Sequence, residues 1–170
     1  FNVTVSGNSI FEVGGDGIAV LRASGDLLVL NNRIDDSGVN GVLLGEAGNV
    51  TVLGTTVSNS GGRGFYLRDL ANVSLTSIAS QTSGGAGLRL ERTDGARPAM
   101  LVTLENATFA GATGPGIRVF DNDATAAGPV LQLTIVDGTG NLICDSDQGI
   151  IFDGADTRLG GNTFNDLAFA

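Results

Sequence analysis

Short runs of alternating apolar and polar residues cover most of the chain. The most regular run is a glycine followed by an apolar, a variable and an apolar residue, and it recurs about every 23 residues between positions 15 and 67. Alternation with a period of two is the signal of a β-strand, and no segment sustains the period of an amphipathic helix. The pattern therefore predicts an all-β protein made of repeats.

The recurring glycine marks the phase of six repeats. Apolar residues stand one and three positions after it in every repeat. Apolar residues also stand fourteen and twelve positions before the glycine. In the last repeat Ile135 occupies the first of these two columns, but the polar Asp137 occupies the second. The six glycines are Gly17, Gly41, Gly64, Gly87, Gly116 and Gly149. Each repeat is thus expected to contain at least two short strands.

A third apolar position in the middle of the repeat predicts a further strand or corner. It is occupied by Ile10, Ile34, Val57, Phe109 and Leu142. In the fourth repeat the position falls on Ser80, and we expect Ile78 to substitute for it. A Ser-Gly pair then follows in three repeats, where we expect the glycine to supply the positive φ of a tight corner.

A unit of about 23 residues with two or three strands and no helix cannot bury its apolar side alone, so neighbouring units must stack. The pattern of Gly-h-x-h strands, polar turns and Ser-Gly corners resembles the right-handed parallel β-helix of the pectin-lyase-like superfamily, over residues 1–164. This resemblance implies a β-solenoid of about seven coils with no evident capping helix. We expect residues 1–170 to be a single domain of this kind, or one segment or subunit of a longer solenoid.

Charge and composition exclude several classes of function. The chain has nine arginines, no lysine, no histidine and eighteen acidic residues, which give a net charge of −9. Nucleic acid is a poor partner for such a chain, because phosphate backbones require clustered positive charge. Mechanisms that need histidine are excluded, and no apolar run is long enough for a membrane span. The single cysteine, Cys144, forms no internal disulfide, and we expect it to be buried.

Two repeats are longer than the others, and both insertions follow the Gly-h-x-h strand. They are residues 91–99 and 121–129, and in stacked coils they would project side by side, where solenoids usually carry binding surface. The candidate binding residues are Arg92, Asp94, Arg97, Asp121 and Asp123, with Arg89 and Arg118 stacked in one column beneath them. Polysaccharide lyases of the resembling superfamily use an arginine as base and acidic residues to hold calcium against a uronate. The resemblance therefore suggests a carbohydrate ligand here.

A structural interpretation of the same charges is also available. Five residues after each glycine, charged residues form a column of Arg22, Glu46, Asp69, Arg92 and Asp121. Opposite charges face each other in two or three steps of this column, and such pairs set the register of stacked strands. The weak candidates for Ca²⁺ ligands are Asp121, Asp123, Asp145 and Asp147, although no EF-hand loop is present.

Two functions remain open from the sequence. The first is a secreted or cell-surface structural or adhesive solenoid that is a homo-oligomer by end-to-end stacking of coils. Leu167 and Phe169 would form its last strand, and residues 1–5 of another copy would follow it in the repeat. The alternative is a carbohydrate-active enzyme or sugar-binding module that uses residues 91–99 and 121–129.

Overall fold

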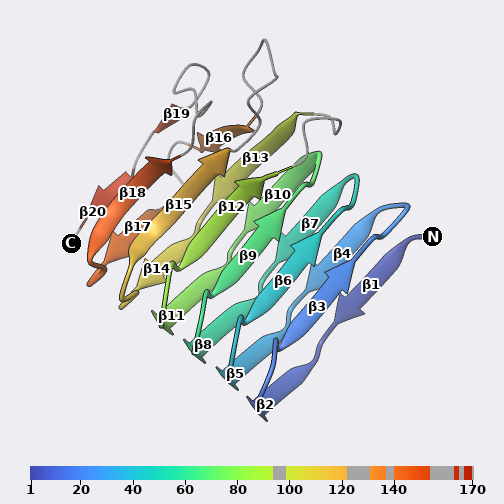
Figure 1. The fold of residues 1–170 in the computed structure, drawn as a ribbon, viewed down its shortest axis with the longest axis horizontal. Coiled ribbons are helices and arrows are strands. Elements are labelled where there is room, and N and C mark those ends of the chain that lie inside the picture. The colour runs from blue at the N-terminus through green and yellow to red at the C-terminus, as the bar shows by residue number, and fades with distance from the viewer. Residues whose placement is uncertain (94–98, 122–130, 137–139, 154–162, 165–166, 170) are drawn as a thin grey trace.

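The computed structural model describes residues 1–93, 99–121, 131–136, 140–153, 163–164 and 167–169. In these residues the chain consists of strands and turns, without a helix, and three parallel sheets run the length of the molecule (Figure 1). Strands β1 to β18 make six coils, each of which adds one strand to every sheet, and β19 and β20 belong to a seventh. No described segment is a long apolar helix of the kind that crosses a membrane. The predicted all-β parallel solenoid is confirmed.

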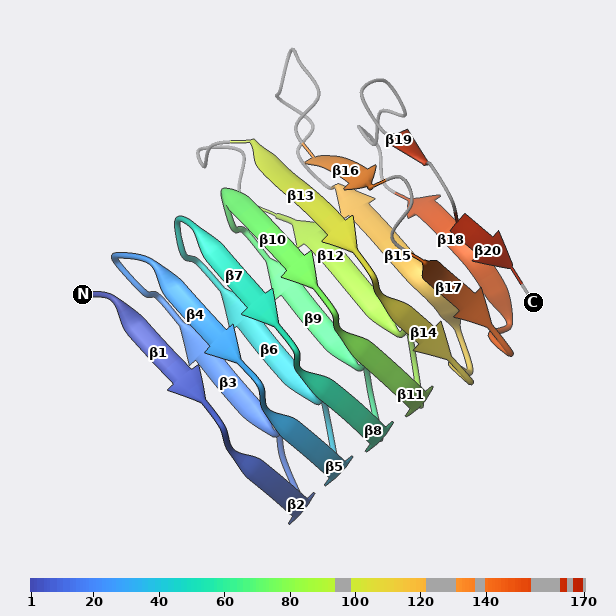
Figure 2. The same ribbon diagram turned by 180° about the vertical axis from the view of Figure 1, so that it is seen from behind.

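The three sheets are named A, B and C in the order in which the chain enters them. Sheet A contains β1 (Val3–Ser6), β4 (Leu27–Leu30), β7 (Val50–Leu53), β10 (Asn72–Thr76), β13 (Met100–Glu105), β16 (Leu131–Ile135) and β19 (Thr163–Phe164). Sheet B contains β2 (Ser9–Val13), β5 (Arg33–Ser37), β8 (Thr56–Ser60), β11 (Ala79–Ser83), β14 (Thr108–Ala110), β17 (Asn141–Cys144) and β20 (Leu167–Phe169). Sheet C contains β3 (Ile18–Leu21), β6 (Val42–Gly45), β9 (Phe65–Arg68), β12 (Leu88–Arg92), β15 (Pro115–Asp121) and β18 (Gln148–Asp153). Figure 1 shows sheet C in front, and Figure 2 shows sheets A and B from behind.

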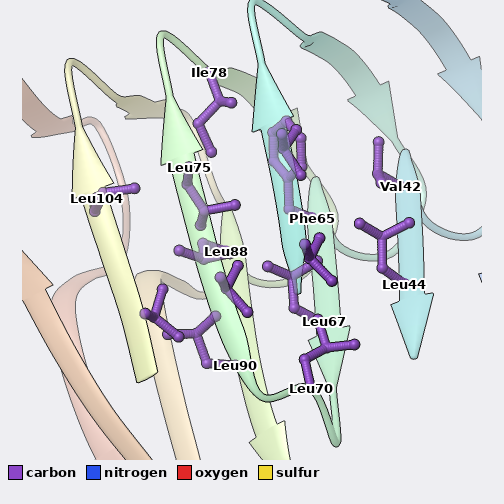
Figure 3. Close-up of a cluster of buried hydrophobic side chains, with 14 of the residues drawn as sticks. Val42, Leu44, Phe65, Leu67, Leu70, Leu75, Ile78, Leu88, Leu90 and Leu104 are labelled. Carbon is purple, nitrogen blue, oxygen red and sulfur yellow. The ribbon is translucent and has the colours of Figure 1, made fainter. Parts of the chain in front are cut away.

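The core occupies the inside of the coils and is built from equivalent positions of successive repeats. In sheet A, Leu27 pairs with Val50 and Val50 with Val73, and all three are buried. In sheet C the inward residues include Phe65 and Leu67, which are packed among leucines of the neighbouring coils (Figure 3). Because every inward side chain rests on its counterparts one coil away, the period of the sequence becomes the register of the sheets.

Two columns shift in the last complete coil. Val102 pairs with Leu133 and Leu104 with Ile135, so apolar residues fill both inward positions of β16. The prediction that placed Ile135 in the first column and Asp137 in the second was therefore wrong by two residues. The packing of β16 against β13 keeps the two strands in register, whereas the number of residues between β16 and the phase-marking Gly149 differs from that in earlier repeats. Asp137 itself lies outside the described residues.

The same effect moves the sheet B column by one residue. Phe109 pairs with Ile143, which is buried, and not with Leu142 as the spacing predicted. Cys144 consequently points to the other side of β17 and is half-buried, so the expectation of a buried cysteine was wrong. A one-residue change of register exchanges the two faces of a strand.

The recurring glycines serve close packing. The glycines of the Ser-Gly pairs were expected to supply the positive φ of the corner after each strand of sheet B, and this expectation was wrong. The positive φ values belong to Asp36, Asn59 and Thr82, at 58°, 53° and 56°. A Cβ added at Gly41 would overlap the side chain of Val57 and lie 2.7 Å from a carbonyl oxygen of the next coil. Glycine is required there because an inward side chain of sheet B fills the space of its Cβ.

Several polar residues inside the coils are hydrogen-bonded to one another, although the hydroxyl of buried Ser37 has no partner in the described residues. Asn32 is buried and accepts a hydrogen bond of 2.9 Å from the side chain of Asn8. Ile78 is buried as expected, and Ser80 is buried as well, with its hydroxyl 2.8 Å from that of Ser83. These contacts satisfy polar groups where the chain turns inside the solenoid.

The last strand lies in a different sheet from the one that the sequence suggested. Leu167–Phe169 forms β20, which pairs with β17 in sheet B. The repeat therefore continues from β20 into sheet C, whereas the first strand of the chain belongs to sheet A. The specific join between the last strand and residues 1–5 of another copy was thus placed in the wrong phase.

Candidate functional site

The outward surface of sheet C is formed by two columns of side chains, which we call the sheet C face. Outward residues come from the variable position of the Gly-h-x-h pattern and from the position two residues later. The first column is Ala19, Leu43, Tyr66, Arg89, Arg118 and Ile151, and the second is Leu21, Gly45, Arg68, Glu91, Phe120 and Asp153. Arg89 and Arg118 are direct neighbours in the parallel register, so their predicted stacking in one column is confirmed.

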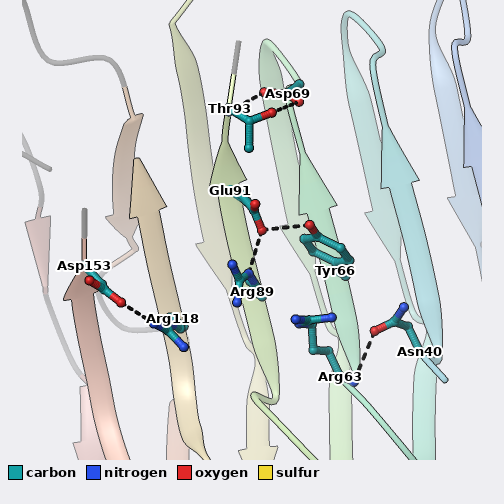
Figure 4. Close-up of polar contacts among 9 residues, drawn as sticks. All are labelled: Asn40, Arg63, Tyr66, Asp69, Arg89, Glu91, Thr93, Arg118 and Asp153. Atoms are coloured by element: carbon teal, nitrogen blue, oxygen red, sulfur yellow. Dashed lines mark hydrogen bonds and ion pairs between the residues drawn. The ribbon is translucent and has the colours of Figure 1, made fainter. Parts of the chain in front are cut away.

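A hydrogen-bonded cluster occupies the middle of this face. The Glu91 carboxylate accepts a hydrogen bond of 2.7 Å from the Tyr66 hydroxyl and another of 2.7 Å from Nε of Arg89 (Figure 4). The Arg89 guanidinium also lies 5.7 Å from the centre of the Tyr66 ring and 5.4 Å from that of Phe120. Charge-assisted hydrogen bonds and cation–π contacts together fix the direction of the arginine side chain.

The environment of Tyr66 changes its acidity. Burial raises the pKa of the phenol above its ordinary value of 10.0, and the hydrogen bond to Glu91 and the charge of that carboxylate act in the same direction. Arg89 and Arg63 oppose this change because their positive charges favour the phenolate. Tyr66 therefore stays a neutral hydrogen-bond donor at physiological pH.

Two further arginines flank the cluster. Arg63 precedes β9, and its guanidinium stacks 4.6 Å from the centre of the Tyr66 ring, while its backbone N–H donates to the Asn40 side chain at 3.2 Å. Arg118 in β15 donates a hydrogen bond to the carboxylate of Asp153 in β18. Figure 4 shows Arg63, Arg89 and Arg118 following one another across three neighbouring coils.

The three arginines line one groove of about 350 Å³. Its remaining lining residues are Gly62, Gly84, Gly85, Ala86 and Gly114 of the turns between sheets B and C, and Pro115, the first residue of β15. These turns stack closely, because the N–H of Gly85 donates to the carbonyl of Gly62 at 2.7 Å and the N–H of Gly114 to that of Gly85 at 3.2 Å. The groove is thus lined by small turn residues and by three guanidinium groups. We call it the sheet C groove.

The other candidate residues are placed differently. Arg92 and Asp121 belong to strands β12 and β15, not to projecting loops, and form a 3.8 Å ion pair with side chains that are 3% and 1% exposed. Asp94, Arg97 and Asp123 lie outside the described residues. The structure therefore brings Arg89 and Arg118 to the surface of one groove and turns Arg92 and Asp121 toward each other.

The charged column at the end of sheet C contains two of the ion pairs that its pattern suggested, Arg22–Glu46 and Arg92–Asp121. Arg22 lies 3.5 Å from Glu46, which is also 3.7 Å from Arg68. Asp69 accepts hydrogen bonds from the N–H and the hydroxyl of Thr93 at 2.7 Å and 2.8 Å. A larger groove of about 470 Å³ lies along this column, but Arg22 and Glu46 in its lining pair with each other and Asp69 is held by Thr93. We therefore interpret it as structural.

The described part of the chain does not fit a calcium site. No group of three or more acidic, histidine or cysteine side chains comes together in the described residues. Asp121 is paired with Arg92, whereas Asp145 and Asp147 are exposed in the turn after β17. Calcium ligation needs several converging oxygen ligands, which these positions do not supply.

Sequence reasoning missed Arg63, Tyr66 and Glu91 as parts of the site. Tyr66 stands at the variable position of its Gly-h-x-h pattern, and Glu91 stands two residues beyond the equivalent position. A comparison of the outward columns between repeats would have revealed a change from aliphatic to charged residues. Residues 91–99 and 121–129 are the more conspicuous departures from the repeat, because they change its length.

Comparisons with known proteins bear on the fold. Neither a curated protein nor a solved structure matches the chain significantly. A family model described as the right-handed β-helix region matches residues 1–164, the same span that its repeats cover. The three parallel sheets agree with this match, and the chain belongs to the right-handed β-helix family.

Proposed function

We propose that the chain is an adhesive β-solenoid of the cell exterior that binds a carbohydrate chain in the sheet C groove. The observation that carries the proposal is the groove itself, which Arg63, Arg89 and Arg118 line beside the ring of Tyr66. Its volume of about 350 Å³ is in the range of small-ligand sites. Fixed planar donors and a neighbouring aromatic ring suit the hydroxyl groups and the apolar faces of sugars.

Binding fits this groove better than catalysis does. An arginine that acts as a base must accept a proton from the substrate, whereas Arg118 is engaged as a hydrogen-bond donor to the Asp153 carboxylate. Glu91 is held by Arg89 and by Tyr66. Both carboxylates beside the groove thus serve to position arginines, which supports a non-catalytic role.

A glycan panel tests this function directly. We expect the wild-type protein to retain at least one class of polysaccharide in affinity electrophoresis. The double variant Arg63→Ala/Arg118→Ala should lose this retention, because two of the three guanidinium groups that line the groove are removed. Arg33→Ala is the matched control, because Arg33 is an exposed arginine of sheet B that leaves the groove intact. Retention that survives in the double variant, or no retention of any glycan, would contradict the proposal.

The lyase alternative has its own assay. A uronate polymer incubated with the protein and Ca²⁺ would yield an unsaturated product with a rise in ultraviolet absorbance, and Arg118→Ala would abolish it. We expect no such rise. Fractionation of the producing cells tests the proposed location, and recovery of the protein from the cytoplasm alone would argue against an adhesive role outside the cell.

End-to-end assembly of copies is a second proposal, and the first coil supports it. Phe11 and Leu21 of this coil are exposed apolar residues, and Val3 and Val5 are only partly buried against the core. The open strand edges beside them are templates for further strands. The same edge would also accept a preceding coil of a longer chain. Sedimentation of the isolated chain tests whether separate copies stack on this edge. A concentration-dependent rise in mass supports stacking, and a monomer at all concentrations contradicts it.

A further inference from the structure

We infer that the sheet C groove is an oxyanion site, in which Arg63, Arg89 and Arg118 bind a carboxylate or sulfate group and Asp153 takes the place of that group when no ligand is bound. The inference deepens the proposed function, because it names the chemical group that the groove recognises. It concerns one anionic group, or a few, held within three adjacent coils.

Three guanidinium groups converge on this groove although the chain as a whole carries a net charge of −9. Arg89 and Arg118 come from paired positions of neighbouring strands, and Arg63 comes from the turn before the preceding strand. Like charges in adjacent coils repel one another, so their placement in a single groove needs compensating negative charge. Glu91 and Asp153 supply part of that charge from within the protein.

Hydrogen-bond donors of these arginines remain available to a ligand. Nε of Arg118 is buried and has no acceptor in the part of the chain that the structure describes. Within the same residues, the Arg63 guanidinium stacks on Tyr66 and forms no ion pair. A buried donor without an acceptor is costly, and two oxygens of a carboxylate or sulfate group can accept two parallel hydrogen bonds from one guanidinium. An incoming carboxylate or sulfate would satisfy these donors.

Asp153 is suited to the role of a replaceable internal anion. Its side chain is 42% exposed and that of Arg118 is 36% exposed, so the pair is open to solvent. Exposed ion pairs contribute little to stability, and a ligand anion can therefore displace the carboxylate at small cost. The Arg89–Glu91 pair differs, because its side chains are 16% and 11% exposed and Tyr66 also holds the carboxylate. Arg89 is thus a fixed part of the site, and Arg118 exchanges its partner.

Titration calorimetry with defined probes tests the inference. The probes are sulfate ion, galacturonate, and the pair of dextran and dextran sulfate, which share a glucan backbone and differ in their sulfate ester groups. We expect dextran sulfate to bind and neutral dextran to bind far more weakly. Arg63→Gln and Arg118→Gln should each weaken binding about tenfold, as loss of a charge-assisted hydrogen bond does. Asp153→Asn should tighten binding roughly threefold, because it removes the competing carboxylate.

Control variants separate binding from folding. Arg33→Gln makes the same change of charge on sheet B and should leave the affinity unchanged. Arg118→Lys should recover part of the affinity that Arg118→Gln loses, since it restores the charge without the planar fork. Each variant should retain the circular dichroism of the wild-type protein. A tighter Asp153→Asn variant cannot be explained by misfolding, so it supports the site independently of the weakened variants.

The outcomes for the oxyanion site and for the proposed function are distinguishable. Neutral and anionic glycans that bind equally well, and that both lose binding in Arg63→Ala/Arg118→Ala, would overturn the oxyanion site and leave glycan binding in the groove in place. Binding of sulfate ion and galacturonate without any polysaccharide would support the oxyanion site and contradict the proposed function. An unchanged or weaker affinity of Asp153→Asn would overturn the role assigned to Asp153.

Discussion

The two halves of the sheet C face differ in chemistry although their backbones repeat. On β3 and β6 the outward positions hold small or aliphatic residues, among them Ala19 and Leu43. On β9, β12 and β15 the same column holds Tyr66, Arg89 and Arg118. Both halves keep the same parallel register, so the change of surface required no change of fold. The comparison shows that outward positions of a solenoid vary independently of its architecture.

The inward positions of the same strands behave in the opposite way. Leu44 of β6 and Leu90 of β12 are both fully buried, and both lie in the same column of the core. Each contacts its counterparts in the adjacent coils, so a change in one coil is felt by its neighbours. Variation is thus confined to the outward side chains, which the packing of the core does not constrain. The following predictions test this separation between the two halves.

The largest effect is expected from core truncation. Leu44→Ala in the aliphatic half and Leu90→Ala in the charged half should each lower the free energy of unfolding by about 2–5 kcal/mol, because each leaves a cavity. Leu43→Ala, at an outward position, should change it much less. Urea unfolding followed by circular dichroism measures all three. A much smaller loss for Leu90→Ala than for Leu44→Ala would show that the charged half has a looser core, which would break the comparison.

Glycine substitutions should have the next largest effect. Gly41→Ala and Gly87→Ala place a Cβ against Val57 and Phe109, and we expect each to lower the free energy of unfolding by about 1–3 kcal/mol through overpacking. Gly14→Ala is the control, because nothing lies within 4 Å of a Cβ at that position. Thermal unfolding compares the three variants. Equal stabilities for all of them would disprove the packing role of the recurring glycine.

The smallest effect concerns the ionisation of Tyr66, which is present only in the charged half. The chain has one tyrosine, so its ultraviolet absorbance reports Tyr66 alone, and the midpoint should lie above 10.0. Glu91→Gln should lower this midpoint, since the negative charge is lost, but burial should keep the pKa above the ordinary value.

The same ionisation is linked to stability at high pH. The folded protein holds the Tyr66 proton more tightly than the unfolded chain does, so the stability from this group is fully present below pH 10.0 and is lost as the pH rises through the folded pKa. Tyr66→Phe should remove this loss. A midpoint at or below 10.0, or a loss that persists in Tyr66→Phe, would contradict the environment described for the phenol.

The core and the strand order could be predicted from the sequence because they repeat. Six glycines in phase, with apolar residues at constant distances, determined which side chains face inward in the first five coils. The prediction failed at Leu142 and Asp137, where turns change in length. Counting along the chain accumulates such changes, whereas packing between strands restores the register after each of them. Cys144 was misplaced for the same reason.

The site could be predicted only in part. The stacking of Arg89 on Arg118 followed from the repeat, since equal phase means adjacent positions in a parallel sheet. The roles of Arg63 and Glu91 did not follow, because no periodic signal marks which outward residues lie within hydrogen-bonding or stacking distance. The charge pattern suggested that Arg92 faces Asp121, but it could not show that both side chains would be buried.

By itself, the sequence determined that the chain is a stack of β-coils and which residues make its core, because burial imposes a period that can be read directly. Only the tertiary structure decided which outward side chains meet across neighbouring coils. Arg63 and Tyr66 are near in the chain, but Arg118 reaches the same groove from 55 positions after Arg63, and Asp153 reaches Arg118 from 35 positions further on. Such meetings depend on side-chain direction and on turn length, which leave no period in the sequence.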